Sequence, residues 1–343
     1  MTRLRSLIVG GATAALVLGG AASKSFAVET DDFTNHLQGG SIGVPAGAAP
    51  PPGLYSGYIQ LIVPSGPLTQ QGNAGVNHVA AELGAIPLVW STGLNFLGAS
   101  YTVAVAQAFY TGFAVAPGGN TAFSAPAVAA FATVANTGLT PIALSWNLHN
   151  GVFISTGLNI AAPDGTRTPG SPNPDYATFE PTLAFSYIDK NWVLSANMYY
   201  DINTASQGKS LGFAGTVFGN GYTSGNVFYA DLTAAYKFGK WEIGPAAIIA
   251  EQTTNDTVGG GFSCNSPIFV AAAGTLGCAR LQEVAFGGLI GYDFGPVDLH
   301  VWATEDIGCG STTNNIGCGL RVFGSIAFRL WAPEAPKPLV AKN

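Results

Sequence analysis

The sequence has few charged side chains, and most of them are acidic. Charged residues make up 9% of the chain, against about 25% in average soluble domains. There are 13 Lys and Arg residues and 19 Asp and Glu residues. Proteins that bind nucleic acid use Lys and Arg to neutralise phosphates, so we expect no nucleic-acid partner. The low charge also suits a chain whose outer surface meets lipid better than one surrounded by water.

Long apolar runs are also missing from most of the chain. A membrane-spanning helix needs about 20 apolar residues, and after residue 27 no segment has 18 in a row. Before that point, Arg3 and Arg5 precede a short apolar run from Leu7 to Gly20. The small residues Ser25 and Ala27 follow at the positions that a signal peptidase reads, so we predict a signal peptide over 1–27. A single membrane anchor is the alternative, and the short run disfavours it. The mature chain then has 10 basic and 19 acidic residues.

Catalytic motifs are scarce. The four histidines, His36, His78, His149 and His300, are far apart in the sequence. No Gly-x-Ser-x-Gly nucleophile elbow is predicted, because the one match to that spacing, Gly39 to Gly43, lies in a Gly- and Pro-rich stretch that suits neither the strand nor the helix of an elbow. One enzymatic alternative stays open, an outer-membrane hydrolase in which His300 acts with Asp298 and Ser325. A histidine beside a carboxylate is more often structural, so we expect no enzyme and no cofactor.

What the sequence does have is a regular alternation. From residue 54 to 331, stretches of about ten residues carry apolar side chains at every second position, which is typical of strands. Short and long connections between them alternate, as in outer-membrane barrels. Twelve strands are predicted, near 54–63, 85–96, 100–110, 139–148, 151–161, 177–188, 191–202, 226–238, 241–253, 282–294, 297–306 and 319–331.

This pattern predicts an all-β fold, an antiparallel up-and-down transmembrane β-barrel of about twelve strands over 54–331, in the outer membrane of a Gram-negative-type bacterium. A soluble β-sandwich is the alternative. An even strand number places both chain ends in the periplasm. Tight turns are expected at sites such as 149–150, 189–190 and 239–240, and an Ala-rich segment, 122–135, is either a short helix or a loop. Pro181 and Pro245 each remove a ladder hydrogen bond, and a β-bulge is one way to absorb them.

The alternation also assigns the two faces of each strand. The apolar face must meet lipid, because Arg or Lys at mid-bilayer costs about 2–4 kcal/mol. Aromatic residues near strand ends, such as Trp192, Tyr236 and Trp241, are expected at the membrane interfaces. The polar face predicts a lumen set, in which a packing role is favoured over a role in permeation for most members. The set comprises Glu180, Asn197, Tyr199, Asp201, Tyr229, Asp231, Lys237, Glu242, Asp293, His300, Arg321 and Arg329.

Two segments outside the barrel strands have their own predictions. Residues 28–53 are rich in Gly and Pro and suit neither a helix nor a strand. We expect this segment to enter the lumen as a plug or gate. Residues 332–343 follow the last strand and are expected to form a periplasmic tail.

Four cysteines fall in the predicted outer loops: Cys264, Cys278, Cys309 and Cys318. An even number in an exported chain predicts two disulfides. Three pairings are possible, and pairing within each loop (264 with 278, 309 with 318) is favoured. The spacings are not Cys-x-x-Cys and no histidine is near, so no metal site is expected.

Eight runs of the sequence are specific in content and order: Pro50 to Tyr55, Pro141 to Trp146, Ala161 to Gly165, Phe179 to Pro181, Asp189 to Ala196, Tyr200 to Thr204, Gly239 to Gly244 and Gln252 to Asp256. They resemble the outer-membrane family named for the meta-pathway of phenol degradation. The resemblance covers most of 38–331, with departures in the long loop 203–225 and in the cysteines. It implies a barrel that admits hydrophobic, often aromatic, compounds.

Together these features predict a channel for passive uptake of small hydrophobic or aromatic organic molecules, surrounded by outer-membrane lipid. The alternatives are a structural or adhesion barrel whose outer loops bind a partner, and the hydrolase described above. The permeant and the oligomeric state do not follow from the sequence.

Overall fold

The computed structural model describes residues 34–67, 78–116, 127–166, 173–207, 223–258, 262–263, 280–309 and 319–333. The predicted signal peptide and most of the predicted tail lie outside these ranges. Among the described residues, no helix is long and apolar enough to cross a membrane.

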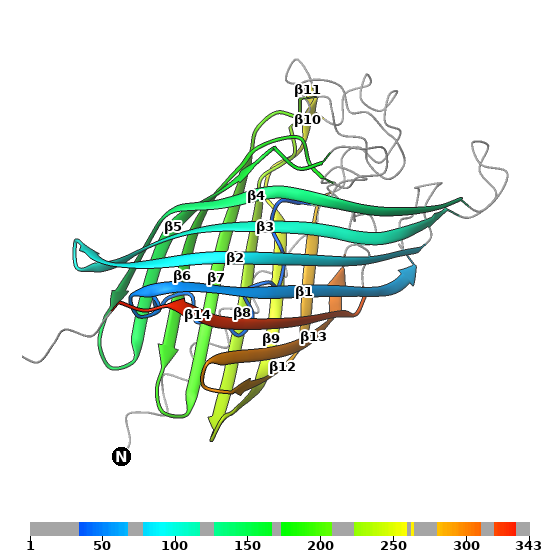
Figure 1. Cartoon of the computed structure of the whole chain (residues 1–343). Helices are drawn as coiled ribbons and strands as arrows, with labels where there is room; N and C mark the ends of the chain where they lie inside the picture. Colours follow the sequence, from blue (N-terminus) through cyan, green and yellow to red (C-terminus); the bar gives the residue numbers. More distant parts are fainter. Residues whose placement is uncertain are drawn as a thin grey trace, which may run out of the picture.

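Twelve strands form one closed antiparallel barrel, which confirms the predicted fold (Figure 1). Each strand pairs with its neighbours in the chain, and β1 pairs with β14 to close the sheet. A two-stranded hairpin, β10 (Thr257–Val258) with β11 (Phe262–Ser263), lies outside the barrel sheet. The barrel strands are β1 (Gly53–Pro67), β2 (His78–Phe96), β3 (Ala99–Ala116), β4 (Ala127–Asn147), β5 (Val152–Ala162), β6 (Thr178–Ile188), β7 (Trp192–Asn203), β8 (Val227–Phe238), β9 (Trp241–Gln252), β12 (Gln282–Asp293), β13 (Val297–Cys309) and β14 (Arg321–Trp331).

The tight turns gather at one end of the barrel, here called the short-turn end, as predicted. At the β4–β5 turn, His149, Asn150 and Gly151 have φ values of 67°, 53° and 82°. Consecutive positive φ angles produce the turn twist that matches paired strands. Gly239 and Gly295, with φ values of 65° and 96°, turn the chain between β8 and β9 and between β12 and β13. The opposite end, where the long connections lie, is called the long-loop end.

The first four strands are longer than predicted. β2 begins at His78 and β4 at Ala127, so much of the expected loops 64–84 and 111–138 is strand. The interpretation of 122–135 as a helix or loop was wrong for its described part. Ala130 and Phe131 pair with Phe113 and Gly112 of β3, and this ladder pairing overrides the weak strand propensity of alanine.

The two strand prolines are accommodated by gaps in the pairing and not by a β-bulge, which the sequence had offered as one way to absorb them. In the β6–β7 pairing, Phe179 pairs with Ile202 and Thr182 with Tyr199, and the pairs between them are missing without a change of register. The β8–β9 pairing is interrupted in the same way opposite Pro245. Each proline therefore costs local hydrogen bonds on one side only.

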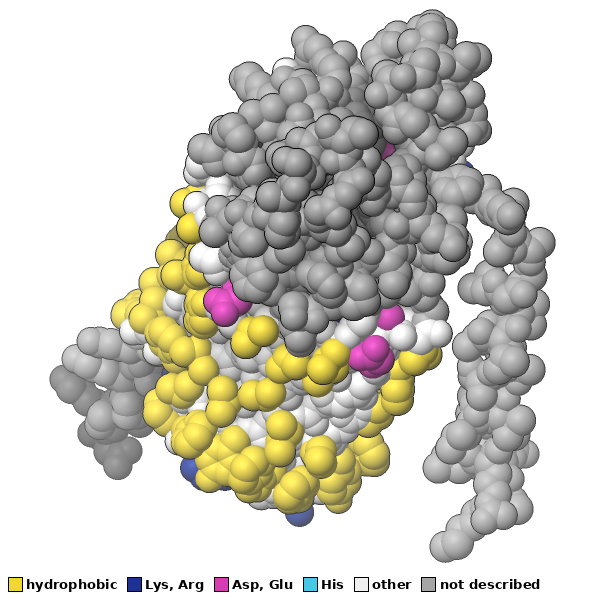
Figure 2. All heavy atoms as spheres, turned by 90° about the vertical axis from the view of Figure 1, so that its right-hand side faces the viewer, with side chains coloured by type: hydrophobic (Ala, Val, Ile, Leu, Met, Phe, Trp, Pro, Cys, Tyr) yellow, Lys and Arg dark blue, Asp and Glu magenta, His cyan; other side chains and the backbone are white. Residues whose placement is uncertain are grey.

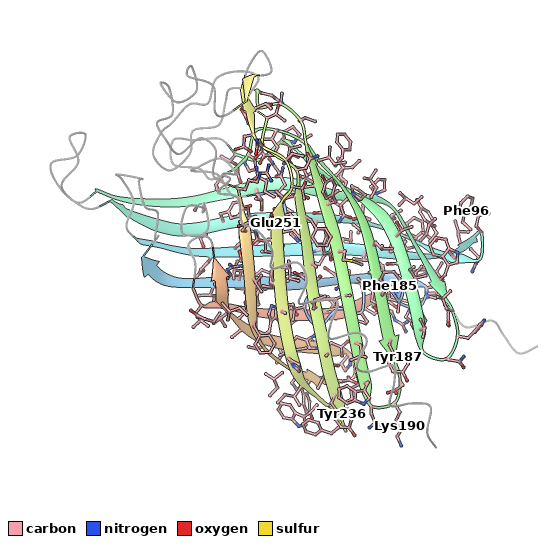
Figure 3. The ribbon with its side chains drawn as sticks, turned by 180° about the vertical axis from the view of Figure 1, so that it is seen from behind. Phe96, Phe185, Tyr187, Lys190, Tyr236 and Glu251 are labelled. Carbon is pink, nitrogen blue, oxygen red and sulfur yellow. The ribbon has the colours of Figure 1, made fainter. Side chains whose placement is uncertain are left out.

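The apolar face of the strands points outward, as predicted. Figure 2 shows hydrophobic side chains covering the described part of one face, with few charged groups. Phe185 and Phe286 are 46% and 53% exposed on strands whose opposite faces are buried. At the short-turn end, aromatic rings contact one another, with Trp192 and Tyr236 5.0 Å apart between ring centroids. Figure 3 shows Phe185 on this outer face and Tyr236 near the end.

Candidate functional site

The candidate site is the barrel interior, into which residues 34–52 fold. This stretch, here called the inner segment, precedes β1 and lies within the ring of strands (Figure 1). Ile42, on the inner segment, is fully buried against inward-facing side chains of the barrel wall. Residues 34–52 belong to the stretch 28–53, which the sequence predicts to enter the lumen as a plug or gate.

A row of hydroxyl side chains binds the backbone of the inner segment. The row lies near the short-turn end on β2 and on β4–β8, and it meets backbone groups of residues 43–50 at 2.6–3.0 Å. Because backbone groups buried away from water need partners, these hydroxyls let an irregular segment lie in the bore. The row comprises Thr233, Ser195, Ser186, Ser155, Ser145 and Ser91.

Asp231 of β8 is the strongest polar anchor of the inner segment. Its carboxylate accepts hydrogen bonds from Gly39 N and Ser41 N, each at 2.9 Å, and from Ser41 Oγ at 2.8 Å. Asn197 of β7 donates to Ser41 O and Val44 O at 3.1 and 2.9 Å. Both side chains are at most 1% exposed, so they act in an environment that strengthens charge-assisted hydrogen bonds.

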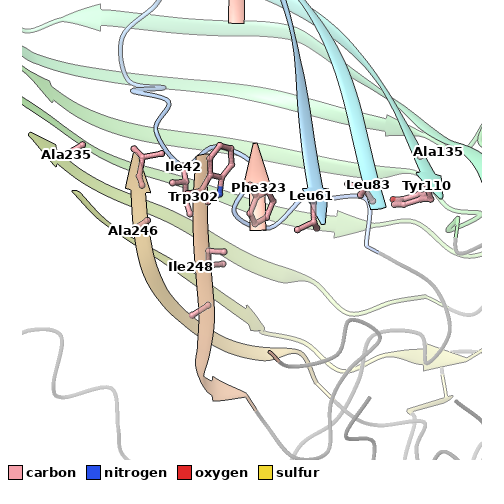
Figure 4. Packing of buried hydrophobic residues seen from close by; sticks show 12 residues of the cluster. Ile42, Leu61, Leu83, Tyr110, Ala135, Ala235, Ala246, Ile248, Trp302 and Phe323 are labelled. Atoms are coloured by element: carbon pink, nitrogen blue, oxygen red, sulfur yellow. The ribbon is translucent and has the colours of Figure 1, made fainter. Parts of the chain in front are cut away.

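Apolar packing holds the same part of the inner segment. Ile42 lies in a cluster with Ile248, Leu289, Trp302 and Phe323 (Figure 4). The rings of Trp302 and Phe323 stack with centroids 5.0 Å apart and planes 8° from parallel. These members fill the bore on the side of β9 and β12–β14, and the cluster continues onto β1–β3 through Leu61, Leu83 and Tyr110.

At mid-bore, His36 of the inner segment meets a group of acidic and aromatic side chains. His36 Nδ1 lies 2.6 Å from Glu180 Oε2, and its ring stacks on Tyr229 at 4.2 Å between centroids. Tyr199 lies on the other side, at 4.6 Å. Asp201 belongs to the same group, with one oxygen within 4.8 Å of ligand atoms of His36 and Glu180.

Arg321 forms a second charged group toward the long-loop end. Its guanidinium lies 2.5 Å from Glu283 Oε1 and 3.2 Å from Asp306 Oδ1, and all three side chains are at most 3% exposed. Arg321 also donates to Gln38 of the inner segment at 3.3 Å. A buried cation with two carboxylates ties β12, β13 and β14 together.

A third group surrounds the mouth of the bore at the short-turn end. A cavity of about 250 Å³ there is lined by Lys237, Glu242, Asp293, Asp298 and His300, with Gly43 and Pro45 of the inner segment. Lys237 Nζ and Glu242 Oε2 are 3.9 Å apart.

The structure thus distributes the predicted lumen set over three groups and leaves one member apart. The mid-bore group contains Glu180, Asn197, Tyr199, Asp201, Tyr229 and Asp231. Arg321 lies closer to the long-loop end. The mouth at the short-turn end contains Lys237, Glu242, Asp293 and His300. Arg329 is exposed at the end of β14, 3.4 Å from Tyr55 Oη. Asp293 is also exposed and accepts a hydrogen bond from Gly295 N in the β12–β13 turn.

The hydrolase alternative has its residues nearby but not its hydrogen bonds. His300 of β13 and Ser325 of β14 are register partners. In the part of the chain that the structure describes, no hydrogen bond joins His300 to Ser325 or to Asp298. A Ser/His/Asp relay depends on those bonds, so nothing in this geometry favours it.

The cysteine prediction falls mostly outside the described residues. Cys264, Cys278 and Cys318 are not among them, and the disulfides stay a prediction. Cys309 is the last residue of β13 rather than a loop residue.

Opposite the packed side, the bore contains an apolar cavity of about 460 Å³. Its floor is the inner segment from Asn35 to Val44, and Tyr199 and Glu180 border it. Much of its wall is made by small or short apolar residues on β1–β5, which leave space because they do not reach the inner segment, and larger residues such as Ile59 and Leu139 and residues 325–327 of β14 complete it. The small or short wall residues include Gly57, Ala85, Pro87, Val89, Ala104, Ala106, Gly138 and Ala161.

Comparison with known proteins agrees with the fold. A protein-family model described as "Putative MetA-pathway of phenol degradation" matches residues 65–321, and a search of curated proteins finds no match. An outer membrane channel from Pseudomonas putida F1 has a similar structure, with a TM-score of 0.58 and 10% identity over 82% of this chain and 96% of that one. The β domain of the Bordetella autotransporter BrkA has a TM-score of 0.44, 11% identity and coverages of 82% and 100%.

The closed sheet, its apolar exterior and the similar channel structure define a transmembrane β-barrel of the outer-membrane type. Within that class, the chain belongs to the family described as "Putative MetA-pathway of phenol degradation", whose model matches about three quarters of its length.

Proposed function

We propose that this protein is a passive outer-membrane channel for small hydrophobic, chiefly aromatic, molecules, which pass beside the inner segment. The observation that carries the proposal is the apolar cavity of about 460 Å³ between the inner segment and the small residues of β1–β5. Sites for small molecules are typically apolar hollows of about 300–1,000 Å³ with a few polar groups. The family description, which refers to phenol degradation, supports an aromatic permeant.

The inner segment gives this channel its selectivity in our proposal. Its hydrogen bonds to Asp231 hold residues 39–41 against the packed side of the bore, and the hydroxyl row holds residues 43–50 near the short-turn end. A hydrophilic solute needs a continuous polar path, and the cavity left beside the segment has mainly apolar walls. Apolar solutes lose little on entering such a space, because burial of apolar surface is favourable. Movement follows the concentration gradient and needs no cofactor.

Gly138 offers a direct test of the passage. A Cβ at this position would meet Ala106 O and Cβ at 3.7 and 3.8 Å, which is ordinary contact. Gly138 lines the cavity, so Gly138→Leu adds a side chain there without forcing the backbone. Gly324→Leu is the matched control, because Gly324 lies in β14 with open space around it and does not line the cavity.

The measurement is uptake of a labelled monoaromatic panel by cells producing each variant. The proposal expects faster uptake with the wild-type protein than without it, at least a several-fold loss in Gly138→Leu, and no loss in Gly324→Leu. Equal uptake by the wild-type and Gly138→Leu proteins would remove the cavity from the path.

A further inference from the structure

The mid-bore group has more negative charge than its neighbours balance. Glu180 and Asp201 lie next to each other on β6 and β7, and both are at most 8% exposed. His36 is the partner of Glu180, and within the described residues no Lys or Arg forms an ion pair with either carboxylate. Isolated buried carboxylates are strongly disfavoured, so this arrangement calls for a positive charge beside the two carboxyl groups, either a bound cation or a proton that they share.

Asp201 has a buried carboxylate oxygen without a partner. Its side chain is 2% exposed, and its Oδ1 has no hydrogen-bond partner. The nearby Asp231 is as deeply buried, but it accepts three hydrogen bonds from the inner segment. Glu180 has Asn159 Nδ2 at 2.6 Å from Oε1 and His36 at Oε2. Among these three carboxyl groups, Asp201 is therefore the one with a buried oxygen that lacks a partner.

The same three side chains have the geometry of a cation site. One ligand atom from each of His36, Glu180 and Asp201 lies within 4.8 Å of the other two. Ligand atoms of a tetrahedral zinc ion are about 3.3 Å apart, since each metal–ligand bond is about 2.0–2.1 Å. Small side-chain rotations close this difference. His36 Nε2 also lacks a hydrogen-bond partner, so the ring has a second nitrogen that is free to bind a metal ion or to carry the proton.

We propose that His36, Glu180 and Asp201 bind a divalent transition-metal cation of the zinc type, which fastens the inner segment to β6 and β7. One imidazole with two carboxylates suits zinc, whereas magnesium and calcium prefer oxygen ligands alone. Binding replaces the proton between His36 and Glu180, because metal ligands must be deprotonated. The proposal does not depend on what the channel carries.

The test is a titration of the mature chain, folded in detergent and stripped of metal with a chelator. Co²⁺ is added first, because its visible absorption reports coordination number, and Zn²⁺ is then used to displace it. The wild-type protein is expected to bind one Co²⁺ per chain with the intense absorption of a low-coordinate site, and Zn²⁺ is expected to displace it at lower concentration. Mg²⁺ and Ca²⁺ are expected to compete poorly.

Asp201→Asn and His36→Gln keep side-chain size and are expected to weaken binding at least about tenfold. His149→Asn is the control, since His149 lies in the exposed β4–β5 turn and is expected to leave binding unchanged. Zn²⁺ should also raise the denaturation midpoint of the wild-type protein but not that of Asp201→Asn. Heat-shifted gel mobility verifies that each variant is folded.

Two results would overturn the proposal. One is a wild-type protein that binds neither Co²⁺ nor Zn²⁺ at micromolar concentration, which would leave a proton shared by Glu180 and Asp201 as the balancing charge. The other is unchanged affinity in both Asp201→Asn and His36→Gln. The wild-type titration decides the first result alone, even where a variant fails to fold.

Discussion

The two sides of the bore have the same backbone but very different contents. On β6–β9 and β12–β14, inward side chains are large or polar, and they hold the inner segment through Asp231, Asn197 and the Ile42 cluster. On β1–β5, many of the side chains beside residues 35–44 are small, and a cavity of about 460 Å³ remains there. Closer to the long-loop end, β1–β3 carry the larger Leu61, Leu83 and Tyr110, which belong to the same apolar cluster as Phe323. Side-chain size on the inner face of the strands therefore decides where the wall packs against residues 35–44 and where it leaves a cavity, whereas hydroxyls on both sides bind residues 43–50.

The largest effect is expected from deletion of the inner segment. Deleting residues 34–50 removes the inner segment and opens the bore to water, so hydrophilic sugars should enter proteoliposomes several-fold faster. Liposome swelling measures this rate. Unchanged swelling would show that the inner segment does not restrict the bore, and the contrast between the two sides would lose its functional meaning.

Arg321→Met tests the charged group on the packed side. It leaves Glu283 and Asp306 buried without their cation, so the free energy of unfolding should fall by about 3–5 kcal/mol. Denaturant titration in micelles measures the change. Arg329→Met is the control, because Arg329 is exposed and its loss should cost no more than about 1 kcal/mol. Similar losses in the two variants would contradict the account.

Gly39→Ala tests how closely the inner segment is packed. Gly39 has a φ of 80°, and a Cβ there would lie 2.5 Å from Ile248 Cδ1. Strain and overpacking together should cost about 2–4 kcal/mol. Gly295→Ala is the control. Gly295 has a φ of 96°, and a Cβ there would have no atom within 4 Å, so this substitution measures the backbone effect alone, about 1 kcal/mol. Equal losses in denaturation midpoint would mean that the packing against Ile248 is loose.

The smallest effect is expected outside both sides, at the β6–β7 turn. Hydrogen bonds from Asn191 N, Trp192 N and Tyr187 Oη lower the pKa of Asp189 from its usual 3.8. A lowered carboxyl pKa contributes stability above the unfolded pKa, and this is lost as pH falls through the folded pKa. Asp189→Asn should therefore be slightly less stable than wild type at pH 7, and the difference should vanish at strongly acid pH. A difference that persists in acid would contradict this origin.

The sequence predicts much of the barrel, because alternation and tight turns are local signals. Strands from β5 onward lie close to their predicted positions, and residues such as Tyr229 and Asp231 face inward as expected. The lengths of β2 and β4 could not be predicted in this way, since their Ala-rich ends have no clear alternation and are fixed by pairing with β3.

The candidate site was harder to predict, because it depends on contacts between distant segments. His36 lies in a Gly- and Pro-rich stretch without periodicity, so nothing in the sequence links it to Glu180, 144 residues away. The hydroxyl row consists of single Ser and Thr residues whose common level appears only once the strand register is known. The partners of Arg321, Glu283 and Asp306, depend on that register in the same way.

The cavity also depends on three-dimensional placement. Gly138, Ala106 and Pro87 are unremarkable one at a time, and they form a wall only because Pro87 pairs with Ala106 and Ala106 with Gly138 across β2–β4.

The most direct test is to locate a small aromatic molecule in the protein. Crystals of the mature chain grown with iodobenzene would show the iodine by anomalous scattering. We predict a peak in the cavity beside Gly138, between the inner segment and the small residues of β1–β5, which is lost in Gly138→Leu. Iodine found only among the outward-facing side chains of the barrel would contradict the account.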